Sequence, residues 1–376
     1  MEFTSPKQTI NCVAYMYKSI GVVSIGLDNL KYASGSLALE RSGNNSGNML
    51  FTEAVYRQIE GTKHIGFNFN PDVVRNEFDS IMIPASNWVN WKQDWGWLAD
   101  LLEQTNLPIC VIGLGSQMDG RSLSEVPEGT VRLLNILSER GSSLGVRGEF
   151  TAQIINDLGV KNISVLGCPS VFSDGRVPEI RPLEKKEDFR LAFGPTRYGF
   201  GKEDFENVKH REMYQYAIKY ASSIYYQSES FEIAFLNRED VGANKEKAVE
   251  YYGLNDFSDL SKKLLEKGKF HSSLAHWITD VKKEDCYIGT RIHGVVSSTL
   301  AGTPSLLITH DKRTEELASY MGVPNISILD FNIKNLSDFG WLSGNINIQN
   351  FMDISKLNIE VLHEFYASHN LMFNRF

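Results

Sequence analysis

One stretch of the chain reads Gly289-Thr290-Arg291-Ile292-His293-Gly294-Val295-Val296-Ser297-Ser298-Thr299-Leu300-Ala301-Gly302-Thr303-Pro304. It lies between two apolar runs, Cys286-Tyr287-Ile288 and Ser305-Leu306-Leu307-Ile308-Thr309. Its small residues favour a close turn, so the pattern predicts a strand, a turn, a helix and a second strand. Repeated units of this kind build a parallel α/β sheet.

Arg291 and His293 are the candidate functional side chains of this stretch. If the turn stays extended through both, the two-residue period of an extended chain sends their side chains to one side. A helix that begins near His293 would add its free backbone N–H groups and the positive end of its dipole, which favour a phosphate or a carboxylate. The alternative is structural: His293 caps the helix and Arg291 pairs with a surface acid.

The composition indicates a globular protein large enough for two domains. The chain has 376 residues, of which 42% are hydrophobic and 22% charged, and its pI is about 5.6. A formal net charge of -8 argues against broad nucleic-acid binding, which needs a basic surface. No partner of that kind is expected.

The cysteines and the chain start bear on the compartment. Cys12, Cys110, Cys168 and Cys286 are far apart and lack the close spacing of a metal clamp or redox pair, so we expect buried thiols and no metal site. The first residues show no secretory signal, and no apolar run reaches the ~18–20 residues of a membrane span. We therefore predict a cytoplasmic protein, with peripheral contact at the inner face of the membrane left open.

The first half of the chain alternates apolar strands with helical segments. The predicted strands include 63–68, 79–85 and 109–113, and this alternation is typical of a parallel, doubly wound sheet. Ligands bind such sheets beyond the carboxyl ends of the strands. Three loops there supply candidates, which are Asn87, Gly115 and Arg147. For Arg147 a structural salt bridge is the alternative.

Two other features of this half admit both a structural and a functional interpretation. Asn45, Gly47 and Asn48 form a loop before a helical pattern, and such a loop either holds a ligand near backbone amides or is an ordinary capped loop. Trp88, Trp91, Trp95 and Trp97 crowd into one stretch. The spacing of the first three is helical, which favours packing against the core over a platform for a sugar ring.

The second half repeats the α/β pattern after a segment, 176–188, that is rich in Pro and charge and is predicted to be a linker. A strand at 190–195 ends before Arg197, a helical run continues through Tyr226, and a strand is predicted at 231–236. The predicted domains are residues 1–187, 188–345 and a C-terminal helix within 346–376 that packs across the junction. The predicted fold is therefore two Rossmann-like, doubly wound α/β domains that face a cleft, the architecture called GT-B.

The stretch quoted first resembles the C-terminal signature of the polysaccharide pyruvyl transferase family. The match consists of Gly289 to Gly294, Ala301-Gly302-Thr303-Pro304 and His310-Asp311-Lys312-Arg313. Weaker landmarks follow the family order, namely Asn45-x-Gly47-Asn48, Gly113-x-Gly115, Val146-Arg147 and Gly167-Cys168-Pro169. Many members have an acidic residue at the position of Asn48 and Asp-Pro-Ala in place of Gly-Cys-Pro, so the subfamily and the acceptor stay open.

The resemblance implies an enzyme that transfers the enolpyruvyl group of phosphoenolpyruvate to a sugar of a surface polysaccharide or its precursor. The product is a pyruvate ketal, phosphate is released, and no cofactor or metal is needed. We expect His293 and Arg291 to be the catalytic residues, with His293 the general acid because the unperturbed pKa of imidazole, about 6.5, makes both of its forms available near neutrality. The expected donor-binding groups are Arg291, Arg197, Arg147 and the backbone at Gly294, because the planar fork of arginine suits phosphate and carboxylate. Of these, Arg197 is the arginine that the resemblance implies, and Arg147 is the third contact. The acceptor sugar is free, nucleotide-linked or lipid-linked.

Two other functions fit the same pattern. A nucleotide-sugar glycosyltransferase shares the two-domain fold, but such enzymes commonly use an acidic residue in the helix after this loop. The helix predicted from His293 to Ala301 contains no Asp or Glu, which favours phosphoenolpyruvate as the donor. A non-catalytic subunit of a polysaccharide-assembly complex would use the cleft only for binding.

Overall fold

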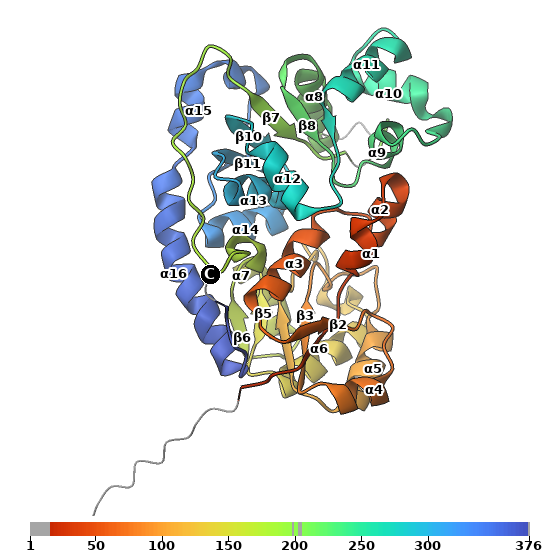
Figure 1. The fold of residues 1–376 in the computed structure, drawn as a ribbon, viewed down its shortest axis with the longest axis vertical. Coiled ribbons are helices and arrows are strands. Elements are labelled where there is room, and N and C mark those ends of the chain that lie inside the picture. The colour runs from red at the N-terminus through yellow and green to blue at the C-terminus, as the bar shows by residue number, and fades with distance from the viewer. Residues whose placement is uncertain (1–15, 198, 202–204, 375–376) are drawn as a thin grey trace, which may run out of the picture.

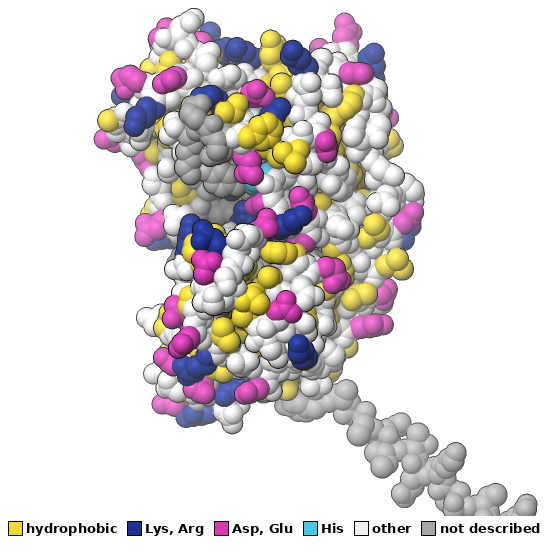
Figure 2. All heavy atoms as spheres, turned by 180° about the vertical axis from the view of Figure 1, so that it is seen from behind, with side chains coloured by type: hydrophobic (Ala, Val, Ile, Leu, Met, Phe, Trp, Pro, Cys, Tyr) yellow, Lys and Arg dark blue, Asp and Glu magenta, His cyan; other side chains and the backbone are white. Residues whose placement is uncertain are grey.

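The computed structural model describes residues 16–197, 199–201 and 205–374. It consists of two α/β halves stacked one above the other, with the long helix α16 (Ile348–Ser368) lying along both (Figure 1). Acidic and basic side chains are interspersed over the face in Figure 2, and hydrophobic side chains appear there only in small groups.

The first half contains a four-stranded parallel sheet with the order β2-β1-β3-β4. A parallel pair, β5-β6, continues it through a bridge between Leu114 and Val146. The strand order reverses between β1 and β3. The strands are β1 (Ile20–Val22), β2 (Thr62–His64), β3 (Ser80–Pro84), β4 (Ile109–Ile112), β5 (Leu144–Val146) and β6 (Ile163–Val165).

The second half contains a six-stranded parallel sheet with the order β12-β11-β10-β7-β8-β9. Counted from its own first strand, this is the 3-2-1-4-5-6 order of the doubly wound fold, and the order reverses between β7 and β10. The strands are β7 (Leu191–Gly194), β8 (Ser223–Tyr225), β9 (Gly268–Lys269), β10 (Cys286–Gly289), β11 (Ser305–Thr309) and β12 (Asn325–Ser327).

Helices connect and cover these strands. Those of the first half are α1 (Leu27–Lys31), α2 (Gly35–Arg41), α3 (Asn48–Gln58), α4 (Pro71–Glu77), α5 (Gly96–Thr105), α6 (Glu128–Arg140) and α7 (Glu149–Asp157), with short 3-10 turns at Leu123–Glu125 and Pro169–Phe172. Those of the second half are α8 (Phe205–Tyr220), α9 (Ser230–Leu236), α10 (Lys245–Tyr252), α11 (Phe257–Lys267), α12 (Leu274–Val281), α13 (Ile292–Leu300), α14 (Lys312–Met321) and α15 (Phe339–Asn345), with 3-10 turns at Gly242–Asn244 and Ile333–Ser337.

The strand sequences are apolar because both faces of each sheet are covered. Along β3, Met82 packs into the core that contains α3 and α16, whereas Ile81 and Ile83 point to the other face and pack with α5 and α6. A strand buried on both faces has no polar side, so it is a continuous apolar run rather than an alternating one. The predicted fold class, two parallel α/β units that face a pocket in a GT-B-like arrangement, is confirmed.

Three predicted elements of the chain were wrong. The segment 231–236 is not a strand but lies in α9, and the helical run ends at Tyr220 in α8, before the short strand β8. Trp88, Trp91 and Trp95 lie in loops and at a helix start rather than along a helix. Trp88 and Trp95 are nevertheless buried in the core, and their rings stack with centroids 4.3 Å apart.

The C-terminal helix contacts both halves. The Asn358 amide donates to the Tyr320 carbonyl in the second half (2.8 Å), and the buried Tyr366 hydroxyl donates to Gln58 Oε1 in the first (2.9 Å). The predicted linker contains no helix or strand between Phe172 and β7. The domain boundaries at residues 187 and 345 stay a prediction.

The described cysteines, Cys110, Cys168 and Cys286, are buried free thiols, as predicted. Cys12 and the predicted lack of a signal at the chain start lie outside the described residues. Within the described ranges, no helix combines the length and the apolar character needed to cross a membrane.

Replacing Tyr366 with Phe should lower the free energy of unfolding by about 1–3 kcal/mol, because Gln58 Oε1 is then left buried without its donor. Denaturant midpoints at unchanged slope measure this loss. Tyr220, which is 69% exposed, is the matched control, and Tyr220→Phe should change stability by less than about 0.5 kcal/mol. Equal midpoints for the two variants would contradict the role given to Tyr366.

Candidate functional site

A hollow of about 300 Å³ opens between the two halves, beyond the carboxyl ends of their strands. Loops that follow β3, β4, β5, β7, β8, β10 and β11 all reach it. We call it the arginine pocket, because Arg147, Arg291 and Arg313 line it. Its other lining residues are Gly43, Asn45, Asn48, Ser86, Asn87, Gln117, Thr196, Gln227, Thr290, Ile292, His293, His310, Thr314 and Leu317.

Arg291 and His293 both line the arginine pocket, although by a different route from the one expected. Arg291 has an extended backbone (φ -107°, ψ 122°) and is the residue before α13, whereas His293 already lies in the first helical turn. The chain is therefore extended at Arg291 but not through His293, and the helix begins near His293 as expected. The helix start at the pocket leaves first-turn N–H groups near a bound ligand, which favours an anion.

A loop of the first half closes over His293. A Cβ atom at Gly47 would lie only 2.5 Å from His293 Nδ1, so this close approach requires glycine. The loop is held by Asn45, whose Oδ1 accepts from the Gly47 N–H (3.0 Å), and by Asn48, whose Nδ2 donates to the Ser42 carbonyl (2.9 Å). Thus Asn45 and Asn48 line the pocket, and Gly47 contacts the imidazole.

His293 is buried and neutral in the free protein. Burial and then the positive charges of Arg147 and Arg291 lower the pKa of His293 to about 3. On its other side, His293 Nε2 lies 3.7 Å from Cys168 Sγ. Because a nearby anion would offset both arginines, ligand binding is the event that would raise this pKa.

Arg147 brings a buried positive charge to the pocket. Its side chain donates from Nε to the Gly113 carbonyl and from Nη1 to Asn87 Oδ1, both at 2.8 Å. Gly115 leaves room for this packing, since a Cβ there would lie 2.9 Å from Arg147 Cδ. No carboxylate of the described residues lies within ion-pair distance of Arg147, and burial lowers the pKa of Arg147. A buried positive charge without a directly paired carboxylate favours an anionic ligand.

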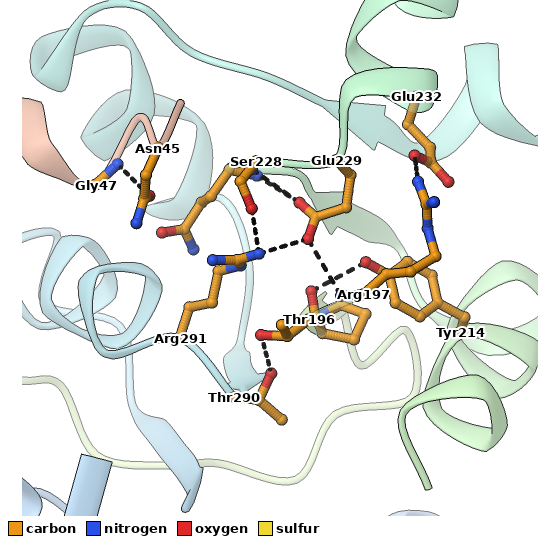
Figure 3. Close-up of polar contacts among 12 residues, drawn as sticks. Asn45, Gly47, Thr196, Arg197, Tyr214, Ser228, Glu229, Glu232, Thr290 and Arg291 are labelled. Atoms are coloured by element: carbon orange, nitrogen blue, oxygen red, sulfur yellow. Dashed lines mark hydrogen bonds and ion pairs between the residues drawn. The ribbon is translucent and has the colours of Figure 1, made fainter. Parts of the chain in front are cut away.

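The charge of Arg291 is partly balanced by a buried acid. Its Nη2 donates to Glu229 Oε1 (2.7 Å) and to the Ser228 hydroxyl (Figure 3). Burial would raise the pKa of Glu229, but the charge of Arg291 and the backbone N–H groups of Ser228 and Gln227 outweigh it and lower that pKa. Arg291 is thereby fixed in place at the pocket wall.

Arg197 does not line the arginine pocket, in contrast to the expectation. Figure 3 shows its guanidinium directed toward Glu232, with which it forms a buried ion pair. Its guanidinium also lies 3.9 Å from the Phe200 ring centroid. The buried acid in α9 explains the difference, because Glu232 would otherwise lack a cation. Gly294 lies behind the pocket wall, where a Cβ would contact the Tyr287 hydroxyl.

Gln117, Gln227, His310 and Arg313 also line the pocket and were not selected from the sequence. Gln117, His310 and Arg313 follow predicted strand ends, so their position was a usable signal. Gln227 follows β8, which was missed. Its Nε2 is buried and has no acceptor among the described residues, so it is available to a ligand.

The family model for polysaccharide pyruvyl transferase matches residues 45–312, well over half of the chain. The chain belongs to the polysaccharide pyruvyl transferase family. The matched span begins at the loop over His293 and ends after β11, so it contains Arg147, Arg291 and His293 of the arginine pocket.

No curated protein matches the sequence. Among solved structures, this chain is similar to UDP-GlcNAc 2-epimerase from Neisseria meningitidis, at 10% identity and a TM-score of 0.47, over 92% of this chain and 100% of that chain. It is also similar to UDP-N-acetylglucosamine 2-epimerase from Rickettsia bellii, at 10% identity and a TM-score of 0.43, over 94% of this chain and 98% of that chain. The glycosyltransferase SnogD from Streptomyces nogalater is 10% identical with a TM-score of 0.34, over 93% of this chain and 96% of that chain. The fold assignment rests on the sheet order given above.

Replacing Arg147 with Met should raise the pKa of His293, because the first of the two positive charges that lower it is removed. Two-dimensional NMR of ring-labelled histidine reads this pKa, with His293→Gln to assign the signal. The wild-type ring should stay neutral through the range in which an ordinary histidine, with a pKa of about 6.5, titrates. Arg132→Met, at an exposed ion pair, is the control and should leave the signal unchanged. An unshifted pKa in Arg147→Met would show that the charge of Arg147 does not help to keep His293 neutral.

Proposed function

We propose that this pyruvyl transferase uses phosphoenolpyruvate as its donor and forms a pyruvate ketal on a saccharide acceptor. The observation that carries the proposal is Arg147, a buried cation at the pocket with no carboxylate partner in the described chain. Arg291, Arg313 and the start of α13 lie around the same hollow. Phosphoenolpyruvate carries a phosphate and a carboxylate, and the planar forks of arginine bind both groups well.

The proposed reaction begins with transfer of a proton to the methylene carbon of phosphoenolpyruvate, which becomes the methyl group of the product. Positive charge develops at C2, and one acceptor hydroxyl forms a C–O bond there and loses its proton. The C2–O bond to phosphate then breaks, and phosphate leaves with the electron pair. A second hydroxyl of the same sugar adds to C2 and loses its proton. One ketal and one phosphate result, with no redox step and no further reactant.

His293 is the proposed proton donor. It is neutral in the free protein because two arginines and burial lower its pKa to about 3. Bound phosphoenolpyruvate would place negative charge beside those arginines and raise the pKa of His293, so that the imidazole gains a proton only when the donor is present. Cys168 lies next to Nε2 of the ring and Gly47 next to Nδ1, so the ring is packed on both of these sides.

A nucleotide-sugar glycosyltransferase is the competing function, and it needs a free acid near the nucleotide. Three carboxylates near the arginine pocket have partners: Glu229 with Arg291, Asp311 with Arg313, and Glu316 with Thr151. Because these three carboxylates already have partners, they are not available to bind a nucleotide-sugar, and the pocket favours an anionic donor.

Thermal stability with added ligands tests the donor directly. Phosphoenolpyruvate, UDP and UDP-sugars are added separately, and a ligand at ~100 times its Kd stabilises the folded state by about 2.7 kcal/mol. A shift with phosphoenolpyruvate supports the proposal. A shift only with UDP compounds would replace it with glycosyl transfer, and no shift with any of them would favour a binding subunit.

Replacing His293 with Ala should retain the thermal shift with phosphoenolpyruvate but lower turnover by roughly 10²–10⁴-fold, because the proton donor is lost and the arginines remain. Turnover is measured as phosphate released from phosphoenolpyruvate with a panel of methyl glycosides as acceptors. His276→Ala, at an exposed position, is the control. Wild-type turnover in His293→Ala would remove His293 from the mechanism.

Replacing Arg291 with Lys should weaken phosphoenolpyruvate binding roughly tenfold, because lysine cannot contact an anion and Glu229 through one planar fork. Calorimetric titration gives the affinity. Arg190→Lys changes an arginine that is ion-paired with Glu284, outside the pocket lining, and should bind as the wild type does. An unchanged affinity in Arg291→Lys would argue against donor binding by this side chain.

A further inference from the structure

A second hollow, of about 250 Å³, adjoins the arginine pocket on the side of the first half. Gly43, Asn48, Ser86 and Asn87 line both hollows, so the two share a wall of small and amide side chains. We call the second one the aromatic hollow, after Phe51, Phe67, Trp88 and Trp95 in its lining.

The aromatic hollow lies at the reversal point of the first sheet. Its lining includes Ser24 and Ile25, which follow β1, and Ser86 and Asn87, which follow β3. These two strands are neighbours from which the chain continues in opposite directions across the sheet. In open α/β sheets, ligands bind at this point, beyond the carboxyl ends of the strands. The arginine pocket occupies the corresponding point of the second sheet, between β7 and β10.

The aromatic hollow has an uncharged lining, unlike the arginine pocket beside it. None of its described lining residues is charged, whereas three arginines line the arginine pocket. Its polar groups are hydroxyls and amides, contributed by Ser24, Asn48, Thr52, Ser86, Asn87 and Gln93. Its aromatic wall is fixed, because the ring centroids of Trp88 and Trp95 are 4.3 Å apart and Phe67 lies 6.2 Å from Trp88.

We infer that the aromatic hollow binds one uncharged sugar ring of the acceptor, an inference that rests on the proposed function. A sugar ring has an apolar face that packs against aromatic side chains and hydroxyls that pair with neutral amides and hydroxyls. A uronate, a sialic acid or a carrier diphosphate would need a cation, and the hollow offers none in the described chain. If the acceptor has a charged carrier, that carrier therefore extends out of the hollow.

The shared wall places the sugar beside the donor. Asn87 accepts from Arg147 through Oδ1 (2.8 Å), which leaves its Nδ2 for another acceptor, and Asn48 holds the loop that covers His293. A ring seated on the aromatic wall thus has hydroxyls at the boundary of the arginine pocket. This is the position from which two neighbouring hydroxyls would reach C2 of the donor.

Ligand-observed NMR with uncharged methyl hexosides and with methyl glucuronide, in the presence of phosphoenolpyruvate, tests the inference on the full-length protein. Phe67→Ala should weaken the uncharged glycosides roughly tenfold, since part of the aromatic wall is lost. Gln93→Lys brings a cation to the hollow and should change the preference toward the glucuronide. Gln104→Lys, at an exposed position on α5, is the matched control and should keep the wild-type preference.

The outcomes separate the two proposals. If phosphoenolpyruvate still shifts the melting temperature of both variants while sugar binding changes as stated, the inference is supported. If sugar affinity is unchanged in both variants, or if the glucuronide binds the wild type better than every uncharged glycoside, the inference is overturned and the donor assignment stands. If uncharged glycosides bind as stated but phosphoenolpyruvate changes the melting temperature of neither the wild type nor the variants, the proposed function fails. The aromatic hollow then remains a sugar site of another activity.

Discussion

The site depends on a buried positive charge, that of Arg147, which has no carboxylate within ion-pair distance among the described residues. Arg147 lies at the end of β5 and gives its hydrogen bonds to a carbonyl and an amide, which orient it but do not neutralise it. The charge of Arg147 helps to keep the neighbouring His293 neutral. Arg291, the second arginine beside His293, forms an ion pair with Glu229. A bound anion would offset the charge of Arg147, which these side chains leave without a paired carboxylate.

The two hollows differ in chemistry, although each lies at the point where the strand order of a sheet reverses. Each sheet has one point at which the strand order reverses, and the two points face each other across Asn48 and Asn87. Charged groups gather at the point of the second sheet and aromatic groups at that of the first. A fold of this kind can hold an anion in a charged pocket and a neutral ring in an adjoining uncharged one.

The sequence predicted most of the strands, because strands such as β3 and β11 are buried on both faces and therefore uniformly apolar. The sequence wrongly predicted a strand where α9 lies, because Glu232 between apolar residues is typical of the solvent-facing side of a strand. In the structure, Glu232 is buried and forms an ion pair with Arg197. The sequence identified Arg147, Arg291 and His293 from strand ends and a family signature. Their settings depend on partners far along the chain, such as Glu229 and Gly47, and no local pattern predicts those contacts.

The contacts of α16 and the residues after it bear on how the protein folds during synthesis. Ile59 forms an antiparallel bridge with Phe373, the Tyr17 N–H donates to the Asn370 carbonyl (2.9 Å), and Tyr366 closes over Gln58. A ribosome makes the first half long before these partners exist. The first half therefore lacks these contacts until residues 366–373 have been made. Chaperone protection of this half should matter most during that interval.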